Sequence, residues 1–392
     1  MLIGQKVTVL GAGIAGLSAA LALALRGASV TVLEQADAIR EVGAGLQISP
    51  NGVAVLRALG LGPALADAGT RGTAVVLRDG ASGKQVLRLD LAGLRPEQGY
   101  YFVHRADLIA TLADAARDAG VRIHLLQHVT EVTLGPHPPR LKNALGSECE
   151  TPLVIGADGL RSVVRQKLNG TIAPFFTHQV AWRAVIPGQP GPAEAEVFMG
   201  PGRHLVSYPL RDGALRNIVA VEERRRWAEE GWQHEDDPQN LRTAFAGFGD
   251  RVQGWLEGLD KVHLWGLFRH PMAERWFQLN EAGQGAVILG DAAHPTLPFM
   301  AQGANMALED AWVLAASIAG HDTLGAALAA YQAARQPRVR AIVEAANRNA
   351  RAYHLRGPAR TLAHMGLKVG GWLLPDAPLR RFDWIYGHDV TA

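Results

Sequence analysis

The sequence has few cysteines, little net charge and no long apolar run. Its single cysteine, Cys149, excludes an internal disulfide framework and any paired-cysteine metal or redox motif, so a reducing cytoplasmic setting is expected. Among 392 residues, 39 are Lys or Arg and 37 are Asp or Glu. The resulting formal charge of +2 is too small to indicate a nucleic-acid-binding surface, and no nucleic-acid partner is expected.

The hydrophobic stretches are also too short to indicate a membrane protein. Residues 17–25 lie between Gly16 and Arg26, and a bilayer span needs about 20 apolar residues. The first expected strand, residues 6–10, begins so early that we expect no signal peptide. Residues 365–375, "MGLKVGGWLLP", are expected to form a buried terminal helix, with a peripheral membrane contact as the alternative.

Residues 6–35, "KVTVLGAGIAGLSAALALALRGASVTVLEQ", have the pattern of a strand, a glycine-rich turn, a helix and a second strand. Gly11 permits the tight turn, Gly13 lets a pyrophosphate approach the backbone, and Gly16 lets the helix pack closely on the strand. Glu34 ends the second strand and is expected to accept hydrogen bonds from ribose hydroxyls. The unit predicts dinucleotide binding, but it does not distinguish FAD from NAD. Its expected cofactor-binding residues are Gly11, Gly13, Ala15, Gly16, Glu34 and Gln35.

Two later segments also run from a buried strand through a loop into a helix. In residues 153–168, "LVIGADGLRSVVRQKL", Asp158 is either a cofactor contact or the N-cap of an ordinary helix that begins near residue 160. In residues 290–312, "GDAAHPTLPFMAQGANMALEDAW", Asp291 follows the carboxyl end of a strand, where ligands bind in parallel sheets. Prolines hold that loop extended, and a helix from about residue 304 directs its free N–H groups toward it. Because a reduced flavin carries negative charge near N1 and O2, this helix favours FAD over NAD.

Five stretches make the chain resemble the single-component FAD-dependent aromatic hydroxylases, also called group A flavoprotein monooxygenases. They are "GAGIAGLSAALAL", "EVGAGLQISPNGVAVLRALGL", "HRADL", "IGADGLRSVVR" and "GDAAHPTLPFMAQGANMALEDAW". The sequence is most similar to the branch with salicylate hydroxylase, 3-hydroxybenzoate 6-hydroxylase and 6-hydroxynicotinate monooxygenase. Without the resemblance, an arginine in the first turn of a helix, such as Arg105, would be expected to point into solvent. The resemblance implies flavin contacts at Gly13, Glu34, Arg105, Asp158 and Asp291, and places Gly303, Ala304 and Asn305 beside the pyrimidine edge of the flavin.

The expected fold class is α/β, with a Rossmann-like FAD-binding domain of the glutathione-reductase type, an inserted, mostly antiparallel β-sheet domain for the substrate, and a C-terminal helical region. The expected FAD-binding domain comprises residues 1–72, 100–170 and 283–350, the substrate domain residues 73–99 and 171–282, and the C-terminal segment residues 351–392. Asp212–Gly213 is expected to close a hairpin between two β-rich runs of the insertion. A long C-terminal helix, expected to be kinked or broken at Pro337, packs on the flavin domain or forms a contact in a homodimer.

One strand of the insertion, "RHLVSYPLR" at residues 203–211, supplies the expected catalytic residues. Alternation places His204, Val206 and Tyr208 on one face, with about 13 Å between the outer Cα atoms, so the two rings can flank a planar substrate. A histidine that titrates near neutral pH suits removal of a phenolic proton. The alternatives are a sheet histidine bonded to a neighbour and an ordinary core tyrosine, and the family resemblance favours the catalytic roles. Further candidates for the substrate pocket are Gln47, Arg183, Pro298 and Phe299.

The resemblance implies an FAD-dependent monooxygenase that uses NADH or NADPH and O₂ to hydroxylate a phenolic aromatic or heteroaromatic acid through a flavin C4a-hydroperoxide. The sequence shows no second nucleotide-binding unit, so the nicotinamide is expected to bind transiently. Two alternatives stay open: oxygenation of a polyketide or alkene on the same scaffold, and a flavin redox sensor that does not oxygenate.

Two further chemistries are not expected. Halogenase relatives carry a W-x-W-x-I-P signature, and in "AWRAVIP" Ala184 replaces its second tryptophan, which argues against halogenation. His294 has no partner at metal-ligand spacing, so we expect it to support the loop rather than bind a metal.

Overall fold

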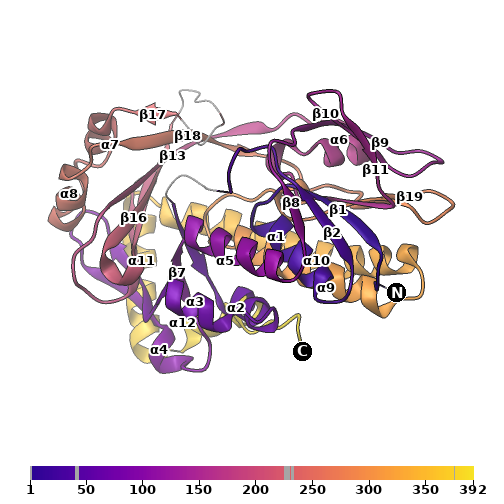
Figure 1. The fold of residues 1–392 in the computed structure, drawn as a ribbon. Helices are drawn as coiled ribbons and strands as arrows, with labels where there is room; N and C mark the ends of the chain where they lie inside the picture. Colours follow the sequence, from indigo (N-terminus) through magenta and orange to yellow (C-terminus); the bar gives the residue numbers. More distant parts are fainter. Residues whose placement is uncertain (1, 40–43, 225–229, 231–233, 375) are drawn as a thin grey trace.

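The computed structural model describes the chain except for residues 1, 40–43, 225–229, 231–233 and 375. Two large sheets lie side by side, and helices flank each of them (Figure 1). The C-terminal helices, drawn in orange and yellow, pass from the side of one sheet to the side of the other. The arrangement confirms the expected α/β class, while the exact domain boundaries stay a prediction.

The first large sheet is mostly parallel. Its strands are β1 (Lys6–Leu10), β2 (Ser29–Leu33), β8 (Arg122–His124), β12 (Leu153–Gly156), β19 (Phe277–Leu279) and β20 (Gly285–Ile288), in the order β19-β20-β12-β1-β2-β8. Val9 pairs with Ile155, and Ile155 pairs with Val287, so the central strands β1, β12 and β20 come from distant parts of the chain. Nearly all residues of these three strands are buried, as expected of parallel strands covered by helices on both faces.

Four helices cover this sheet: α1 (Ile14–Ala24), α5 (Arg105–Asp118), α9 (Gly303–Gly320) and α10 (Leu324–Tyr353). Helix α1 crosses close to β1 because Gly16 has no side chain. A Cβ atom at Gly16 would lie 1.9 Å from the carbonyl oxygen of Gly11, so any other residue would push the helix away from the strand. This close crossing brings the N-terminus of α1 to the carboxyl end of β1.

Smaller elements connect the two large sheets. One three-stranded sheet contains β3 (Gly45–Ile48), β4 (Gly69–Arg71) and β7 (Tyr101–His104), and another contains β9 (Val129–Thr133), β10 (Arg140–Asn143) and β11 (Glu148–Glu150). The short helices are α2 (Pro50–Ala58), α3 (Gly62–Ala68), α4 (Leu91–Leu94), α6 (Val163–Asn169), α12 (Ala377–Arg380) and α13 (Asp383–Tyr386).

The second large sheet has eight strands and is mostly antiparallel. Its strands are β5 (Ala74–Asp79), β6 (Gln85–Asp90), β13 (Phe175–Pro187), β14 (Glu194–Gly200), β15 (Arg203–Leu210), β16 (Leu215–Glu223), β17 (Glu235–Asp236) and β18 (Val262–Arg269), in the order β17-β18-β13-β16-β15-β14-β5-β6. The parallel pairing of β14 with β5 joins residues 74–90 to this sheet. The expected hairpin is confirmed, because Asp212 and Gly213 both have positive φ in the turn between β15 and β16.

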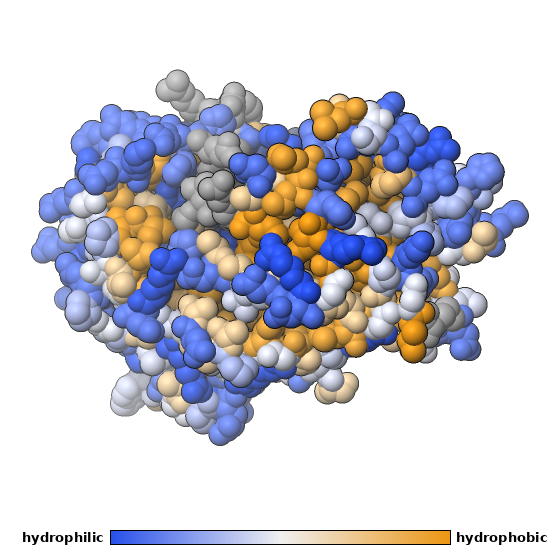
Figure 2. All heavy atoms as spheres, in the orientation of Figure 1, coloured by the Kyte–Doolittle hydropathy of each residue, from blue (hydrophilic) through white to orange (hydrophobic). Residues whose placement is uncertain are grey.

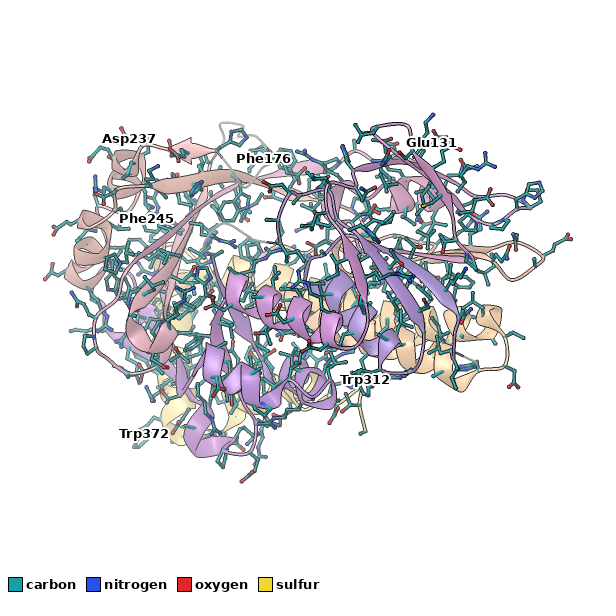
Figure 3. All side chains as sticks on the ribbon, viewed as in Figure 1. Glu131, Phe176, Asp237, Phe245, Trp312 and Trp372 are labelled. Atoms are coloured by element: carbon teal, nitrogen blue, oxygen red, sulfur yellow. The ribbon has the colours of Figure 1, made fainter. Side chains whose placement is uncertain are left out.

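One face of this sheet is covered by α7 (Pro238–Ala244) and α8 (Asp250–Glu257). Figure 3 shows Phe245 beside these helices, and its ring meets the edge of Trp182 on β13 at 6.3 Å between centroids. Both side chains are fully buried. The opposite face of the sheet is therefore the one available to line a site.

Of the two outcomes expected at Pro337, a kink or a break, the break is wrong, and the kink stays a prediction. Helix α10 runs continuously from Leu324 to Tyr353 with the proline inside it. A proline removes the hydrogen bond to the carbonyl four residues earlier, here Ala333. Ala333 and Pro337 are both exposed, so water can satisfy that carbonyl without interrupting the helix.

The expectation of a buried terminal helix is also wrong. Helix α11 (Gly357–Leu373) forms, but it has no buried residue. Trp372 is 82% exposed and lies at the lower left edge of the molecule in Figure 3. The helix packs on β6 through small residues such as Gly371, where a Cβ atom would lie 2.7 Å from Leu87, and its large apolar residues face outward. Among the described residues, none of the helices combines the length and hydrophobicity needed to cross a membrane.

Apolar side chains are also visible on the face of the molecule drawn in Figure 2. They gather toward the middle of that face, whereas the rim is mostly hydrophilic. Single exposed apolar residues are normal for globular proteins. The exposed residues of α11 differ because six large ones follow each other closely in sequence: Leu362, Met365, Leu367, Val369, Trp372 and Leu373.

A buried ion network fastens α9 to α10. Arg335 contacts both Glu309 and Asp310, and all three side chains are at most 1% exposed. Burial alone would raise the pKa of Asp310, but His294 and Arg335 hold it at about 2. The network therefore keeps two carboxylates charged inside the protein.

We predict that Arg335→Leu destabilises the protein strongly, because it leaves two buried carboxylates short of a cation. The expected loss in free energy of unfolding is about 3–5 kcal/mol. Urea unfolding followed by circular dichroism would measure it, with Arg340→Leu, an exposed arginine on the same helix, as the control. Equal stability of the two variants would contradict the prediction.

Candidate functional site

A cavity of about 1180 Å³ lies between the two large sheets. Its lining includes residues that follow strands of the parallel sheet within three positions, namely Gly11 after β1, Glu34 after β2, Asp158 after β12 and Asp291 after β20. Ligands bind at the carboxyl ends of strands in sheets of this kind. At its other end the cavity reaches β5, β6, β14, β15 and β16 of the eight-stranded sheet.

The end of the cavity near β1 and β2 has an open, glycine-lined turn. Gly13 is the N-cap of α1, and a Cβ atom added there would meet no atom within 4 Å. The carboxylate of Glu34 accepts hydrogen bonds from the amides of Ala12 at 2.7 Å and Ala36 at 2.9 Å. These bonds fix the acid beside the helix N-terminus, where backbone N–H groups and the helix dipole favour a phosphate.

Asp158 and Asp291 stand in the cavity wall between its two ends. Asp158 accepts a hydrogen bond from the amide of Val163 at 2.8 Å, and the N-cap of the following helix is Ser162, so this helix begins later than expected. Burial raises the pKa of Asp158, although Ser162 and nearby amides oppose the shift. Desolvation by the surrounding protein also raises the pKa of Asp291, whereas the charges of His294 and Arg105 lower it. Asp291 is still accessible to solvent and Asp158 is half-buried, so both carboxylates can reach polar groups of a ligand bound in the cavity.

The loop before α9 closes the middle of the cavity. Gly303 is the first residue of α9 and lines the cavity with Ala304, so free amides of the first turn lie at its wall. Asn305 does not line it. Its side chain donates to the carbonyls of Gln47 at 3.0 Å and Ala301 at 2.8 Å, and thus ties the loop to β3.

The structure brings together nearly all the residues expected to hold a cofactor. Gly16 packs α1 against β1 and Asn305 fastens the loop, so neither lines the cavity. The expected residues that do line it are Gly11, Gly13, Ala15, Glu34, Gln35, Arg105, Asp158, Asp291, Gly303 and Ala304. The cavity wall has open space at Gly13, the N-termini of α1 and α9, and carboxylates that hydrogen bonds hold in place. These features fit FAD.

The strand β15 presents its expected face to the other end of the cavity. His204, Val206 and Tyr208 line the cavity, whereas Leu205 packs in the core on the opposite side of the sheet. The predicted alternation is therefore confirmed. The expected pocket residues Gln47, Arg183, Pro298 and Phe299 also line the cavity.

Tyr208 lies in a tightly packed polar cluster. Its ring stacks on Phe102 with 5.2 Å between centroids, and a Cβ atom on Gly45 would lie 2.6 Å from the ring. Burial raises the pKa of Tyr208 strongly, although Arg183, Asn217 and Gln47 oppose the shift. The phenol therefore stays protonated at neutral pH and can donate a hydrogen bond.

His204 is nearly fully buried and contacts a second histidine. Its Nδ1 lies 2.7 Å from Nε2 of His354. Burial, followed by the charge of His354, lowers the pKa of His204 well below its usual range. The expectation that His204 titrates near neutral pH is therefore wrong: the ring is already neutral at pH 7, and it is a weaker base than a free imidazole.

Sequence reasoning missed several residues at the end of the cavity that β15 lines. His354 lies just past the end of α10, 150 residues from His204, and no spacing in the sequence links the two. Chain segments at the C-terminal side of the cavity were not expected there either. The missed lining residues include Tyr100, Tyr353, His364, Phe382 and Tyr386.

His294 takes part in the buried ion network instead of a metal site. Its Nε2 contacts the carboxylate of Asp310, and its side chain is 1% exposed. Among the residues that the structure describes, no group of three or more His, Cys, Asp or Glu side chains could hold a metal ion.

Comparison with known proteins decides the family. A family model described as an FAD binding domain matches residues 5–346. The chain belongs to the FAD-dependent aromatic hydroxylases. This hydroxylase is 33% identical to the 3-amino-4-hydroxybenzoate 2-monooxygenase PtmB3 of Streptomyces platensis, over 98% of this chain and 96% of that protein. It is 31% identical to the 3-hydroxybenzoate 6-hydroxylase of Klebsiella oxytoca, again over 98% of this chain and 96% of the relative.

A solved structure of a protein in complex with FAD has the same fold as this hydroxylase. The crystal structure of Klebsiella pneumoniae HpxO complexed with FAD and uric acid has a TM-score of 0.81 and 28% identity, and covers 95% of each chain. The family resemblance stated from the sequence is therefore confirmed, with FAD as the cofactor of this monooxygenase and NADH or NADPH as its co-substrate.

Proposed function

We propose that this hydroxylase acts on a single aromatic ring that carries a hydroxyl group and a carboxylate, of the hydroxybenzoate, aminohydroxybenzoate or hydroxypyridine acid type. One observation carries the proposal: the cavity brings together the neutral imidazole of His204 and the guanidinium of Arg183, which lies on the same sheet. A base suits the phenolic proton, and a guanidinium suits the carboxylate. The two relatives are named for an aminohydroxybenzoate and a hydroxybenzoate, and both of these compounds carry a hydroxyl group and a carboxylate.

The roles of the lining residues follow from their chemistry. Bound FAD, reduced by NAD(P)H, would activate O₂, so that one oxygen atom is added to the ring and the other leaves as water. His204 accepts the phenolic proton, which makes the ring more nucleophilic. Tyr208 donates a hydrogen bond from its neutral phenol, and Arg183 binds the carboxylate. Gln47, Pro298 and Phe299 shape the pocket around the ring.

We assign the cofactor contacts in the same way. The first turn of α1 binds the pyrophosphate, Glu34 binds the ribose, and Arg105, Asp158 and Asp291 hold the polar middle of FAD. The first turn of α9, at Gly303 and Ala304, stabilises the negative charge of the reduced ring.

The location and assembly of the hydroxylase are further proposals. The lone Cys149, which is exposed and free, supports a cytoplasmic location, and the exposed apolar residues of α11 support a homodimer. Cell fractionation and analytical ultracentrifugation would test these two points.

A substrate screen tests the proposed activity. The purified hydroxylase, loaded with FAD, is mixed with hydroxybenzoates, aminohydroxybenzoates and hydroxypyridine acids, and NAD(P)H oxidation and product mass are followed. At least one acid should accelerate NAD(P)H oxidation and gain one oxygen atom. If only long alkene or polyketide compounds gain oxygen, the proposed substrate class is wrong. If flavin is reduced and no compound gains oxygen, a redox sensor explains the protein better.

We predict that Arg183→Met weakens binding of the acid substrate more than it slows turnover. The guanidinium lies 5.0 Å from the ring of Trp265, a contact that holds it at the cavity wall. Loss of a charge-assisted hydrogen bond costs about 1.5–3 kcal/mol, which corresponds to a rise in KM of roughly tenfold to a hundredfold. Steady-state kinetics would show this rise for the acid and little change for the corresponding phenol without a carboxylate. An equal rise for both compounds would remove Arg183 from carboxylate binding.

A further inference from the structure

A chain of hydrogen bonds leads from the cavity wall to the protein surface. Nδ1 of His204 lies 2.7 Å from Nε2 of His354, and Nδ1 of His354 lies 3.0 Å from Oε1 of Glu223. His204 is 2% exposed and His354 is 5% exposed, but the side chain of Glu223 is 38% exposed. The three groups therefore connect a buried base to bulk water.

The backbone holds the members of this chain in place. The amide of Gly202 donates to the carbonyl of His354 at 3.2 Å, and the amide of Glu223 donates to the carbonyl of Gly202 at 2.9 Å. Arg356 binds Oε2 of Glu223 at 2.7 Å, which leaves Oε1 to His354. The turn between β14 and β15 thus fixes the end of β16 and the end of α10 relative to each other.

The carboxylate decides where the protons of both neutral imidazoles lie. A carboxylate only accepts hydrogen bonds, so Nδ1 of His354 must carry the proton that it donates to Glu223. Nε2 of neutral His354 is then an acceptor, and Nδ1 of His204 must carry the proton between the rings. Nε2 of neutral His204, the nitrogen that the His354 contact leaves for the cavity, is therefore unprotonated. This is the form that can act as a base.

The surroundings keep both rings neutral. Burial lowers the pKa of His354, Glu223 raises it, and Arg356 and Arg203 lower it further. Around His204 the structure places Phe299 and Tyr353, whose phenol has a pKa raised by burial to about 12, and the neighbouring strands oppose it with Met199 and Val221. These four neighbours are uncharged at pH 7, whereas other described residues that line the same cavity, among them Arg183, Arg348 and His364, can carry charge.

We propose that Glu223, acting through His354, holds His204 in the tautomer with a free Nε2, and that these three residues carry the phenolic proton of the substrate to water and back. The inference rests on the proposed role of His204 as the base. Glu223 and His354 are positioning and relay residues, since neither is required to touch the substrate.

The proton transfers balance in both directions. When the substrate O–H bond breaks, Nε2 of His204 gains the proton, its Nδ1 proton passes to Nε2 of His354, and the Nδ1 proton of His354 passes to Glu223 and then to water. After oxygen transfer, Glu223 takes a proton from water and the same bonds carry it back to the product oxygen. Both imidazoles then regain their starting tautomers, so the chain is ready for another substrate.

Substitution of Glu223 by glutamine tests the inference. A glutamine amide can donate to Nδ1 of His354, which reverses the proton positions and places a proton on Nε2 of His204. An orienting carboxylate acts on a catalytic histidine in this way in triad enzymes. We expect Glu223→Gln to lower kcat about a hundredfold, near the lower limit for general-base catalysis, with little change in KM. Glu223→Asp should restore part of kcat.

The matched control is Glu222→Gln, one residue away on the same strand. Glu222 pairs with Arg203 and Arg224 instead of the histidines, so its substitution should leave kcat unchanged. FAD content of each purified variant reports whether the fold is intact. If Glu223→Gln binds FAD and turns over as fast as the wild type, the inference is overturned.

A second measurement reads the proton positions without turnover. ¹⁵N NMR of the histidine rings in the FAD-loaded protein should show His204 protonated at Nδ1 in the wild type and at Nε2 in Glu223→Gln. A wild-type His204 protonated at Nε2 would overturn the inference even if the enzyme hydroxylates phenols. If instead no aromatic acid is hydroxylated by the wild type, the proposed function fails, and the NMR spectra still decide whether Glu223 sets the tautomer.

Discussion

Asp291→Ala is expected to yield protein that is folded but colourless. Asp291 lies three residues after the end of β20 in the cavity wall. Desolvation by the surrounding protein raises its pKa, and the charges of His294 and Arg105 oppose that shift. A carboxylate in such a place binds hydroxyl groups through charge-assisted hydrogen bonds, worth about 1.5–3 kcal/mol each. Losing two of them corresponds to a drop in FAD affinity of roughly 10²- to 10⁴-fold.

Flavin absorbance of the purified variant and a fluorescence titration with FAD would measure this loss. Asp322→Ala removes an exposed acid beyond the end of α9 and serves as the control that should retain FAD. Asp291→Asn keeps a hydrogen-bonding group, so its affinity for FAD should lie between those of Asp291→Ala and Asp322→Ala. A yellow Asp291→Ala protein with one FAD per chain would remove this residue from cofactor binding.

His204→Ala is expected to separate flavin reduction from hydroxylation. The FAD-binding end of the cavity is untouched, so the variant should remain yellow and oxidise NAD(P)H. Without the base, kcat for hydroxylation should fall by about 10²- to 10⁴-fold, and the reducing equivalents should appear as hydrogen peroxide. Product mass would measure hydroxylation of the substrate, and a peroxide assay would measure the hydrogen peroxide released.

The pH dependence gives an independent check on His204. A base must be unprotonated, and the pKa of His204 lies well below its usual range because of burial and His354. Wild-type kcat should therefore be constant through neutral pH and fall only as the pH drops through that lowered pKa. The pH profile of His204→Ala should not show this fall of kcat at low pH. His263→Ala, which removes a half-buried histidine of β18, is the control that should keep it.

The sequence predicted the cofactor end of the site well because each of its parts is local. Gly11, Gly13 and Glu34 lie within one strand–helix–strand unit, and their spacing alone reports a turn that fits a phosphate. The loop before α9 is equally self-contained. Alternation along β15 likewise predicted which side chains share a face, since that depends only on strand geometry.

The parts that sequence reasoning missed depend on contacts between distant segments. His354 follows an ordinary amphipathic helix, and its meeting with His204 depends on how α10 lies across the eight-stranded sheet. The outward face of α11 was missed because hydrophobic composition predicts burial only on average. At Pro337, local propensity predicted a kink or a break, and the helix continues through the proline without a break.

The strand order of the parallel sheet has a consequence for how the hydroxylase is made. Its centre joins Val9 to Ile155 and Ile155 to Val287, so the ribosome must synthesise most of the polypeptide before β12 gains both of its neighbours, β1 and β20. At about 5–20 residues per second, reaching β20 takes roughly a quarter of a minute to a minute. Until then β1 can pair with β2 and β12, but β12 lacks β20. The part of the cavity wall that follows β20 therefore forms late, and we expect FAD to enter only after that.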